Sequence, residues 1–464
     1  MFNQLTYLKT WLTRPRTLPT PLGQLVILAI ILVLALDLRL QSVLLTEVDT
    51  PIRADARDHF LYAYNLRHFG TYSRSIAIPN SSLDKPTPDA LRPPVYPLFV
   101  SLFIMADSAQ LSLKSLLVAQ ALISTLTVFI AFTLFRTFLT PSLTLAATFL
   151  TAISPHLVTM NIYVLTETLF CFLVVTAFWA IARVADNRLW PLVVSGLLLA
   201  VGSLTRPAIQ YFIVPWLTYL VWHFRYQQPI RRGVLVLVTF SLIFGIWTMR
   251  NLYTLDRSAD NTLMISTLHH GAYPGFMYND DPKTFGFPYR FDPKTPQIDK
   301  SLKTVIEEIQ HRFREEPAKY VRWYLFGKPI ALWSWSIVAG MGDVFVYPVT
   351  STPYTYLPQF QLTHMVMYAL HWPLVLLALA GCIIAWLPSS LTRLSKPQAF
   401  TARSISLLLI YFTLLHMVGA PFPRYSIPLR PFLYGMAMFT VAIGVAVVRA
   451  RIVRRIALPE TNLQ

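Results

Sequence analysis

Long uninterrupted apolar runs constrain this sequence more than any other feature. Ten runs reach about twenty residues, the length that an α-helix needs to cross the hydrocarbon core of a bilayer. They occupy residues 22–44, 113–135, 142–160, 164–184, 189–206, 207–224, 233–253, 365–386, 404–420 and 431–448. Backbone polar groups in lipid must be hydrogen-bonded within their own segment, so such runs form helices. The sequence therefore predicts an all-α integral membrane protein with about ten transmembrane helices.

The composition excludes a soluble globule, because 55% of the 464 residues are apolar and only 13% are charged. The net charge of +17 does not indicate nucleic-acid binding, since the basic residues lie at the ends of apolar runs, where membrane topology places them. Cys171 and Cys382 both lie inside apolar runs. We interpret them as small buried side chains and expect no disulfide framework.

The basic residues also predict the orientation of the chain. Short loops that face the cytoplasm are enriched in Lys and Arg, and the even-numbered connections carry Arg136, Arg183, Arg188, Arg225, Arg231, Arg232, Arg393, Lys396 and Arg403. Lys9, Arg14 and Arg16 precede the first run, which we interpret as an uncleaved signal anchor. Both termini are therefore expected in the cytoplasm, with a transmembrane domain at 1–448 and a basic cytoplasmic tail at 449–464.

Two long segments then fall on the outer side of the membrane, at 45–112 and 254–364. In the second segment, Asp299 is predicted to cap an amphipathic helix that stops at Pro317. The stretch Tyr320–Gly340 is rich in Trp and Tyr but is interrupted by charged residues and proline. We interpret it as an interfacial helix, although its length leaves a membrane crossing open.

Candidate functional groups gather at this outer face. Ionisable side chains are costly within lipid, so a working site should collect them at one membrane surface. The candidate catalytic carboxylates are Asp55, Asp58 and Glu167, and the candidate phosphate-binding cations are Arg250, Arg206, Arg92, Lys85, Lys328 and Arg424. A few carboxylates among several cations form a set that binds a lipid phosphate while deprotonating a neighbouring group.

Simpler interpretations remain open for several of these residues. Asp55 is suited to cap the helix that follows it, and Glu167 to complement a helix dipole. Arg206 and Arg250 are placed to extend from span ends toward the membrane surface. His269 and His270 have no Cys or carboxylate at ligand spacing, so we expect neither a metal nor another cofactor.

Several short motifs resemble one family of membrane enzymes. They are Asp55-Ala56-x-x-His59-x-x-x-Ala63-x-Asn65-Leu66-x-x-x-Gly70-x-Tyr72-Ser73, Arg92-Pro93-Pro94-x-Tyr96-Pro97, Thr166-Glu167-Thr168-Leu169-Phe170, Leu204-Thr205-Arg206-Pro207, Trp247-Thr248-Met249-Arg250-Asn251 and Arg424-Tyr425-Ser426-x-Pro428. In order and spacing these motifs resemble the GT-C glycosyltransferases related to protein O-mannosyltransferases and lipid A aminoarabinose transferases.

The resemblance implies an inverting sugar transfer from a polyprenyl-monophosphate donor to an acceptor hydroxyl at the extracytoplasmic face of a cell inner membrane. It implies that Asp55 is the general base, that Glu167 supports the site, and that arginines neutralise the leaving phosphate. The sequence departs from the family in having His59 where an aromatic residue is common, and Glu167 where many relatives have Asp.

A transporter or flippase of a lipid-linked or small amphipathic substrate is the alternative function. Such proteins place ionisable groups and broken helices near mid-membrane, whereas most charges here lie at span ends. The sugar and the acceptor, whether lipid, glycan or protein, stay undetermined. The segment 254–364 is the expected acceptor-side lid, because long outer loops carry substrate selection.

Overall fold

All ten predicted apolar runs fold as helices. The computed structural model describes residues 20–76, 85–105, 108–184, 188–338 and 342–457. Its main helices are α2 (Pro21–Leu45), α5 (Ala109–Phe135), α6 (Pro141–Ile153), α7 (Pro155–Thr159), α8 (Glu167–Arg183), α9 (Trp190–Ser203), α10 (Ile213–His223), α11 (Pro229–Leu255), α18 (Pro358–Ile384), α20 (Lys396–Val418) and α21 (Arg430–Ala457).

Fewer than ten of these helices have the length of a full span. Among the described residues, six are long and apolar enough to cross a membrane, or seven if the bent pair α6 and α7 counts as one span. The run predicted at 164–184 has only 17 helical residues in α8, and α9 has 14. Pro207 begins a 3-10 helix, η3 (Pro207–Phe212), before α10, so the run at 207–224 is also divided.

The helices form a bundle in which α8 is almost wholly enclosed. It packs against α5 and α9, while α9 packs against α11 and α18 packs against α21. Two glycines permit close helix contacts: a Cβ at Gly196 would lie 2.8 Å from the Val236 carbonyl oxygen, and one at Gly381 would lie 2.6 Å from that of Met436. Small residues allow such backbone approach within membranes, where packing replaces the hydrophobic effect.

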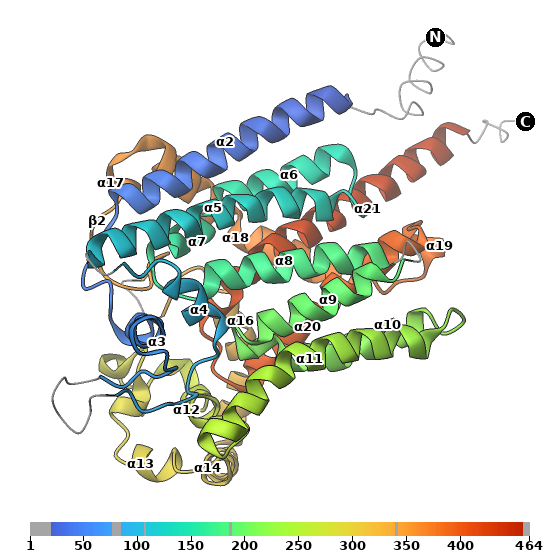
Figure 1. The fold of residues 1–464 in the computed structure, drawn as a ribbon. Helices are drawn as coiled ribbons and strands as arrows, with labels where there is room; N and C mark the ends of the chain where they lie inside the picture. The colour runs from blue at the N-terminus through green and yellow to red at the C-terminus, as the bar shows by residue number, and fades with distance from the viewer. Residues whose placement is uncertain (1–19, 77–84, 106–107, 185–187, 339–341, 458–464) are drawn as a thin grey trace, which may run out of the picture.

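Short elements gather at one end of the bundle (Figure 1). From the first outer segment come β1 (Glu47–Val48), α3 (Ala54–Phe69) and α4 (Val95–Ser101). From the second come α12 (Thr262–Gly271), η4 (Pro274–Phe276), η5 (Pro282–Thr284), η6 (Pro288–Arg290), α13 (Thr295–Ile298), α14 (Leu302–Glu315), α15 (Pro317–Arg322), η7 (Trp323–Gly327), α16 (Lys328–Leu332), β2 (Val349–Ser351) and α17 (Pro353–Tyr356). The remaining short elements are η1 (Met160–Ile162), α19 (Ser389–Thr392) and η8 (Pro423–Leu429).

The two segments predicted to lie outside the membrane, 45–112 and 254–364, are joined by a small antiparallel sheet. Strand β1 pairs with β2, with Glu47 opposite Ser351. The backbone N–H of Asp49 extends the contact by donating to the Pro348 carbonyl oxygen at 2.9 Å. Because β1 lies shortly before α3 and β2 lies just before α17, this sheet holds the start of α3 against the second predicted outer segment.

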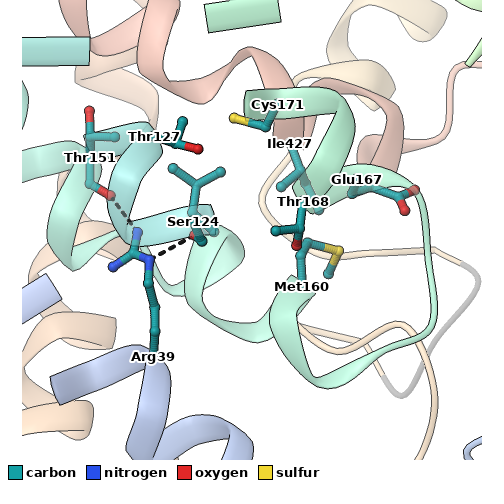
Figure 2. A pocket seen from close by; sticks show the side chains of 10 residues that line it. Arg39, Ser124, Thr127, Thr151, Met160, Glu167, Thr168, Cys171 and Ile427 are labelled. Carbon is teal, nitrogen blue, oxygen red and sulfur yellow. Dashed lines mark hydrogen bonds between the residues drawn. The ribbon is translucent and has the colours of Figure 1, made fainter. Parts of the chain in front are cut away.

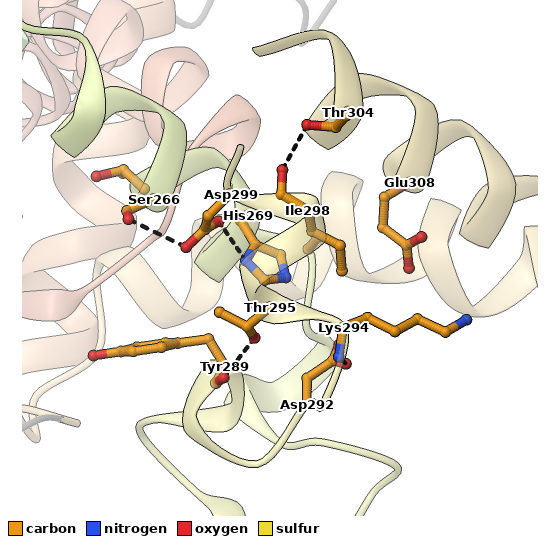
Figure 3. Close-up of polar contacts among 12 residues, drawn as sticks. Ser266, His269, Tyr289, Asp292, Lys294, Thr295, Ile298, Asp299, Thr304 and Glu308 are labelled. Atoms are coloured by element: carbon orange, nitrogen blue, oxygen red, sulfur yellow. Dashed lines mark hydrogen bonds and ion pairs between the residues drawn. The ribbon is translucent and has the colours of Figure 1, made fainter. Parts of the chain in front are cut away.

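The amphipathic helix predicted in the second segment is α14, but its predicted cap is wrong. Ser301 caps it, with a reciprocal capping box to Thr304. Asp299 instead approaches Nδ1 of His269 on α12 at 2.7 Å (Figure 3). The helix ends at Glu315, before Pro317, as predicted.

The stretch Tyr320–Gly340 is not one of the candidate spans among the described residues. Its helical part consists of the end of α15, the π-helical turn η7 and α16, which ends at Leu332. Residues 339–341 lie outside the described residues.

Helix α2 begins and α21 ends at the same end of the bundle, opposite the end that carries α3, α12 and α14 (Figure 1). This arrangement agrees with an even number of crossings between them. The predicted basic residues Lys9, Arg14 and Arg16 and positions 458–464 of the predicted tail lie outside the described residues.

Candidate active site

The spacing of the first motif is explained by how α3 begins and ends. Arg53 is the N-cap residue and makes no side-chain cap bond, so the interpretation of Asp55 as the helix cap is wrong. Asp55 lies in the first turn. At the other end Gly70 adopts φ +63°, a left-handed conformation that glycine tolerates, and its N–H donates to the Leu66 carbonyl oxygen.

The chain that returns from α3 is held in place by two residues of the same motif. Asn65 donates from its amide to the carbonyl oxygens of Ser73 and Ser75, both at 2.8 Å. The Tyr72 hydroxyl donates to the Arg92 carbonyl oxygen at 2.9 Å. Arg92 is thereby brought back over the first turn of α3.

Asp55 lies between two arginines. Its Oδ1 is 2.8 Å from Nη2 of Arg92, and its Oδ2 is 2.6 Å from Nη2 of Arg424 on η8. Arg92 also donates from Nε and Nη2 to Oδ2 of Asp58, at 3.0 and 2.9 Å. All four side chains are at most partly exposed, with Asp55 the most exposed at 30%.

Glu167 extends this chain of charges into the bundle. Its Oε1 is 3.0 Å from Nε of Arg424 and 2.9 Å from Nη1 of Arg206. Arg206 directly precedes Pro207 and has an extended backbone, as a residue before proline prefers. Its guanidinium carbon lies 4.5 Å from the centre of the Tyr425 ring. The order of contacts is therefore Asp58, Arg92, Asp55, Arg424, Glu167 and Arg206.

This arrangement sets the protonation of the groups on α3. Burial alone would raise the pKa of Asp55, but the charges of Arg424 and Arg92 outweigh it and hold that pKa well below its usual range. Burial, with the charge of Arg92, lowers the pKa of His59 to about 3. His59 packs edge-on against Tyr96, so at neutral pH it is an uncharged packing residue and Asp55 is a carboxylate.

Glu167 also lines a small enclosed cavity in the bundle (Figure 2). Its volume is about 10 Å³, which is about the size that one water molecule requires. Across the cavity lies Arg39, a fully buried residue that donates to Ser124 Oγ at 2.7 Å and to the Ala152 carbonyl oxygen at 2.8 Å. The Oε2 atom of Glu167 is buried and has no hydrogen-bond partner among the described residues.

Arg250, at the end of α11, contacts the first outer segment but not its carboxylates. Its Nη1 donates to the Asp89 carbonyl oxygen at 2.9 Å and its Nη2 to that of Tyr72 at 3.2 Å. Its guanidinium also lies over the rings of Tyr72 and Trp247. Arg250 therefore ties the loop that carries Arg92 to the bundle.

The two predicted lysines lie apart from the candidate carboxylates. Lys328 is fully buried and donates from Nζ to the carbonyl oxygens of Val418 and Gly419, at 3.2 and 2.9 Å, where α20 ends. Burial lowers the pKa of Lys328 to about 6. Lys85 is exposed. Neither lysine has an ion pair with Asp55, Asp58 or Glu167 among the described residues.

Two residues at the site were not assigned by sequence reasoning. Arg74 lies 3.8 Å from Oδ1 of Asp58, and Tyr425 supports Arg206 and Arg424 through its ring. Tyr425 directly follows Arg424 in a motif that the sequence analysis singled out, so its position was a usable signal. Arg74 carried no comparable signal, because it lies in a polar loop whose path depends on Asn65 and Tyr72.

The histidines of the second outer segment take part in protein contacts. His269 lies 2.6 Å from the Tyr273 hydroxyl through Nε2, in addition to its contact with Asp299. Nε2 of His270 lies 3.2 Å from the Gly286 carbonyl oxygen. In the part of the chain that the structure describes, no group of three or more His, Cys, Asp or Glu residues is placed to hold a metal ion.

Comparison with solved structures shows the fold. The archaeal oligosaccharyltransferase AglB from Archaeoglobus fulgidus, in complex with an inhibitory peptide and a dolichol-phosphate, aligns over 95% of this chain with a TM-score of 0.51 and 14% identity. Its apo form aligns over 96% of this chain with a TM-score of 0.50 and 13% identity. The chain covers 52% and 53% of those two proteins, or about half their length.

A third structure, ArnT from Cupriavidus metallidurans bound to undecaprenyl phosphate, aligns over 96% of this chain and 82% of its own. It is 14% identical, and its TM-score of 0.39 is too low to establish a shared fold. No curated protein matches the sequence.

The family comparison covers the middle of the chain. Residues 91–247 match the model described as dolichyl-phosphate-mannose-protein mannosyltransferase. The match includes Arg92, Glu167 and Arg206, whereas Asp55 and Arg424 lie outside it. The resemblance predicted from the sequence is therefore confirmed: this multi-pass membrane chain is similar in fold to the archaeal oligosaccharyltransferase AglB and, over residues 91–247, in sequence to the dolichyl-phosphate-mannose-protein mannosyltransferase family.

Proposed function

We propose that this chain is a membrane glycosyltransferase. It transfers a sugar from a polyprenyl-monophosphate donor to an acceptor hydroxyl with inversion, at the extracytoplasmic face of the inner membrane. The observation that carries the proposal is the placement of Asp55 between Arg92 and Arg424, at 2.8 and 2.6 Å. This placement puts a carboxylate base beside cations that suit a phosphate.

The comparisons support the donor class. The matched family is described by a dolichyl-phosphate sugar, and AglB was solved with a dolichol-phosphate. A polyprenyl monophosphate is neutralised by arginines alone, since guanidinium groups hold two phosphate oxygens at once. The proposed reaction therefore needs no metal.

In the proposed step, the acceptor O–H gives its proton to the carboxylate of Asp55 while its oxygen bonds to the anomeric carbon. The bond from that carbon to the phosphate oxygen breaks, and its electron pair leaves with the polyprenyl phosphate. Attack opposite the leaving group inverts the anomeric centre. A general base of this kind contributes about 10²–10⁴-fold to the rate.

Arg424, Arg206 and Arg92 are the proposed phosphate-binding residues because they lie nearest the carboxylates. A phosphate bound by Arg424 offsets part of the positive charge that Asp55 experiences. The pKa of Asp55 then rises from its depressed value, which makes the carboxylate a stronger base once the donor is present. Asp58 holds Arg92, and Glu167 holds Arg206 and Arg424, in position.

The remaining basic residues, Arg250, Lys328 and Lys85, have secondary roles in the proposed site. Arg250 fixes the loop that presents Arg92, through Asp89 and Tyr72. Lys85 stays a candidate phosphate contact for a donor that enters beside the first outer loop. Lys328 stays one for a donor that enters beside α16 and whose phosphate restores the charge that burial removes.

The proposed topology has ten spans, with α8, α9 and η3–α10 as the short crossings and both termini in the cytoplasm. The segments 45–112 and 254–364 then form the outer catalytic loop and the acceptor-side lid. Short crossings are tolerable for α8 because neighbouring helices, rather than lipid, surround it.

The test is sugar transfer by purified, reconstituted protein. Label is supplied on a panel of polyprenyl-phosphate sugars, and the wild type is compared with Asp55→Asn and with the exposed control Asp49→Asn. We expect donor turnover to fall by about 10²-fold or more in Asp55→Asn, with donor binding retained, because only the base is lost. Equal turnover in Asp55→Asn and wild type would remove Asp55 from this role, and movement of intact donor across the bilayer without transfer would favour a flippase.

A further inference from the structure

An open groove of about 530 Å³ lies beside the candidate active site. Its charged lining residues are Arg57, Asp58, Arg74, Asp89, Arg257 and Asp260. Asp58 faces this groove and also binds Arg92, which in turn binds Asp55. Two successive ion pairs, Asp58–Arg92 and Arg92–Asp55, therefore connect the groove to the proposed base. The volume of the groove lies within the range of small-molecule sites, about 300–1,000 Å³.

The three carboxylates of the groove are already occupied by protein donors. Asp58 accepts two hydrogen bonds from Arg92. Asp89 accepts from the backbone N–H groups of Arg74 and Leu91, at 3.0 and 3.2 Å, and from the Tyr62 hydroxyl.

Asp260, the third carboxylate, accepts from the backbone N–H of Thr262 at 3.0 Å and from Arg257 at 3.2 Å. Since all three carboxylates are satisfied, they offer little capacity to bind a cation.

Arg57 and Arg74 make no side-chain hydrogen bond among the described residues, whereas Arg257 already donates to Asp260. The side chain of Arg57 is exposed and has no hydrogen bond or ion pair with any other described residue. The side chain of Arg74 is 47% exposed, and its ion-pair contact to Asp58 is long, at 3.8 Å. The free hydrogen-bonding capacity of the groove is thus made of guanidinium N–H groups, which bind phosphate and carboxylate oxygens strongly.

We propose that this groove binds a phosphate group of the acceptor through Arg57 and Arg74, so that the protein glycosylates a hydroxyl close to that phosphate. The inference rests on the proposed transferase function. An anion held by these arginines lies beside Asp58, which binds Arg92 and through it Asp55. The anion belongs either to a free phosphate ester or to a lipid headgroup.

Binding is tested with two probes that share one headgroup. The first is sn-glycerol 1-phosphate, followed by ³¹P NMR, with glycerol as the neutral comparison. The second is phosphatidylglycerol in nanodiscs, with phosphatidylcholine as the comparison, followed by lipid retention in native mass spectrometry. The variants are Arg57→Gln/Arg74→Gln and the matched control Arg67→Gln, which changes another exposed arginine of α3 outside the groove.

We expect affinity for at least one anionic probe to fall by roughly tenfold or more in the double variant and to be unchanged in the control. Binding of sn-glycerol 1-phosphate would identify a free phosphate ester, and retention of phosphatidylglycerol alone would identify a lipid headgroup. Neutral and anionic probes that bind equally, or a double variant that binds both anions like wild type, would overturn the proposal.

Measuring donor turnover distinguishes a failure of the groove proposal from a failure of the proposed transferase function. If wild type consumes a polyprenyl-phosphate sugar but KM for the anionic acceptor is the same in the double variant, the groove proposal fails and the transferase stands. If no donor is bound or consumed while anion binding still depends on Arg57 and Arg74, the transferase fails and the groove remains an anion site. Undecaprenyl phosphate binding serves as the control for the donor side and should be equal in wild type and the double variant.

Discussion

Asp55 and Arg424 are 369 positions apart in the chain, yet Oδ2 of one lies 2.6 Å from Nη2 of the other. The contact joins the first turn of α3 to η8, which precedes the last helix. It also links two sets of charges, because Arg424 contacts Glu167 as well as Asp55. The candidate site therefore forms only after both α3 and η8 have packed against the bundle.

Arg424→Gln should reduce transfer more than it reduces stability. The substitution removes the positive charge shared by Asp55 and Glu167, so donor phosphate binding weakens and the pKa of Asp55 rises toward its ordinary value. We expect KM for the donor to rise by roughly tenfold or more. Donor titrations with Arg424→Gln and Arg424→Lys measure this. Unchanged donor KM in both variants would exclude a phosphate-binding role.

Glu167 and Arg206 should be strongly coupled in stability. Their ion pair is 2.9 Å long and nearly buried, with side-chain exposures of 1% and 12%. Breaking such a pair leaves an uncompensated buried charge and costs roughly 3–5 kcal/mol. We expect Glu167→Gln and Arg206→Gln each to lower the thermal midpoint in detergent, and the double variant to lose less than their sum. If the losses of stability in the two single variants add up to the loss in the double variant, the contact between Glu167 and Arg206 contributes no coupling free energy.

Arg250→Gln should loosen the first outer loop without unfolding the bundle. The arginine holds the carbonyl oxygens of Asp89 and Tyr72, and the loop beyond them presents Arg92. Hydrogen exchange at residues 85–92 should become faster, while exchange in α8 stays slow. Arg231→Gln, at the other end of α11, is the control. Unchanged protection at 85–92 would show that the loop is held by other contacts.

Lys328 should make stability rise with pH. Its pKa is about 6 in the folded protein because of burial, against 10.5 as its ordinary value. Between these pH values the unfolded chain binds the proton and the folded protein does not, so folding becomes more favourable as pH increases. The thermal midpoint of wild type should therefore rise between about pH 6 and pH 9 more than that of Lys328→Met. If the thermal midpoints of wild type and Lys328→Met change with pH to the same extent, the lowered pKa of Lys328 is wrong.

Arg39→Lys should destabilise the bundle although the charge is kept. The guanidinium of Arg39 reaches Ser124 Oγ and the carbonyl oxygens of Ala35, Ala152 and Thr151, at 2.7 to 3.3 Å. One ammonium cannot reach all four acceptors, and a buried unsatisfied polar group costs about 1–3 kcal/mol.

Thermal unfolding in detergent should show a lower midpoint for Arg39→Lys than for the exposed control Arg231→Lys. Equal midpoints would mean that the acceptors find other partners.

The sequence by itself determined the membrane class, the positions of the helices and the face at which charges collect. These properties are local: run length decides whether a helix reaches across a bilayer, and proline and charge mark where it ends. Even the stop before Pro317 was readable in this way. Local pattern was less reliable for helix caps, because several nearby residues can each fill the cap position. Ser301 rather than Asp299 caps α14, and Asp55 does not cap α3.

Only the tertiary structure decided which charges meet. Arg250, Arg206 and Arg424 have similar positions near span ends, and Lys328 lies in an interfacial stretch. Nothing in a local window shows which of these cations meets a carboxylate. The packing of η8 against α8 brings Arg424 to Glu167 and Asp55, whereas Arg250 meets loop carbonyls and Lys328 meets the end of α20. Ion pairing depends on distance in space, which the order of residues along the chain does not specify.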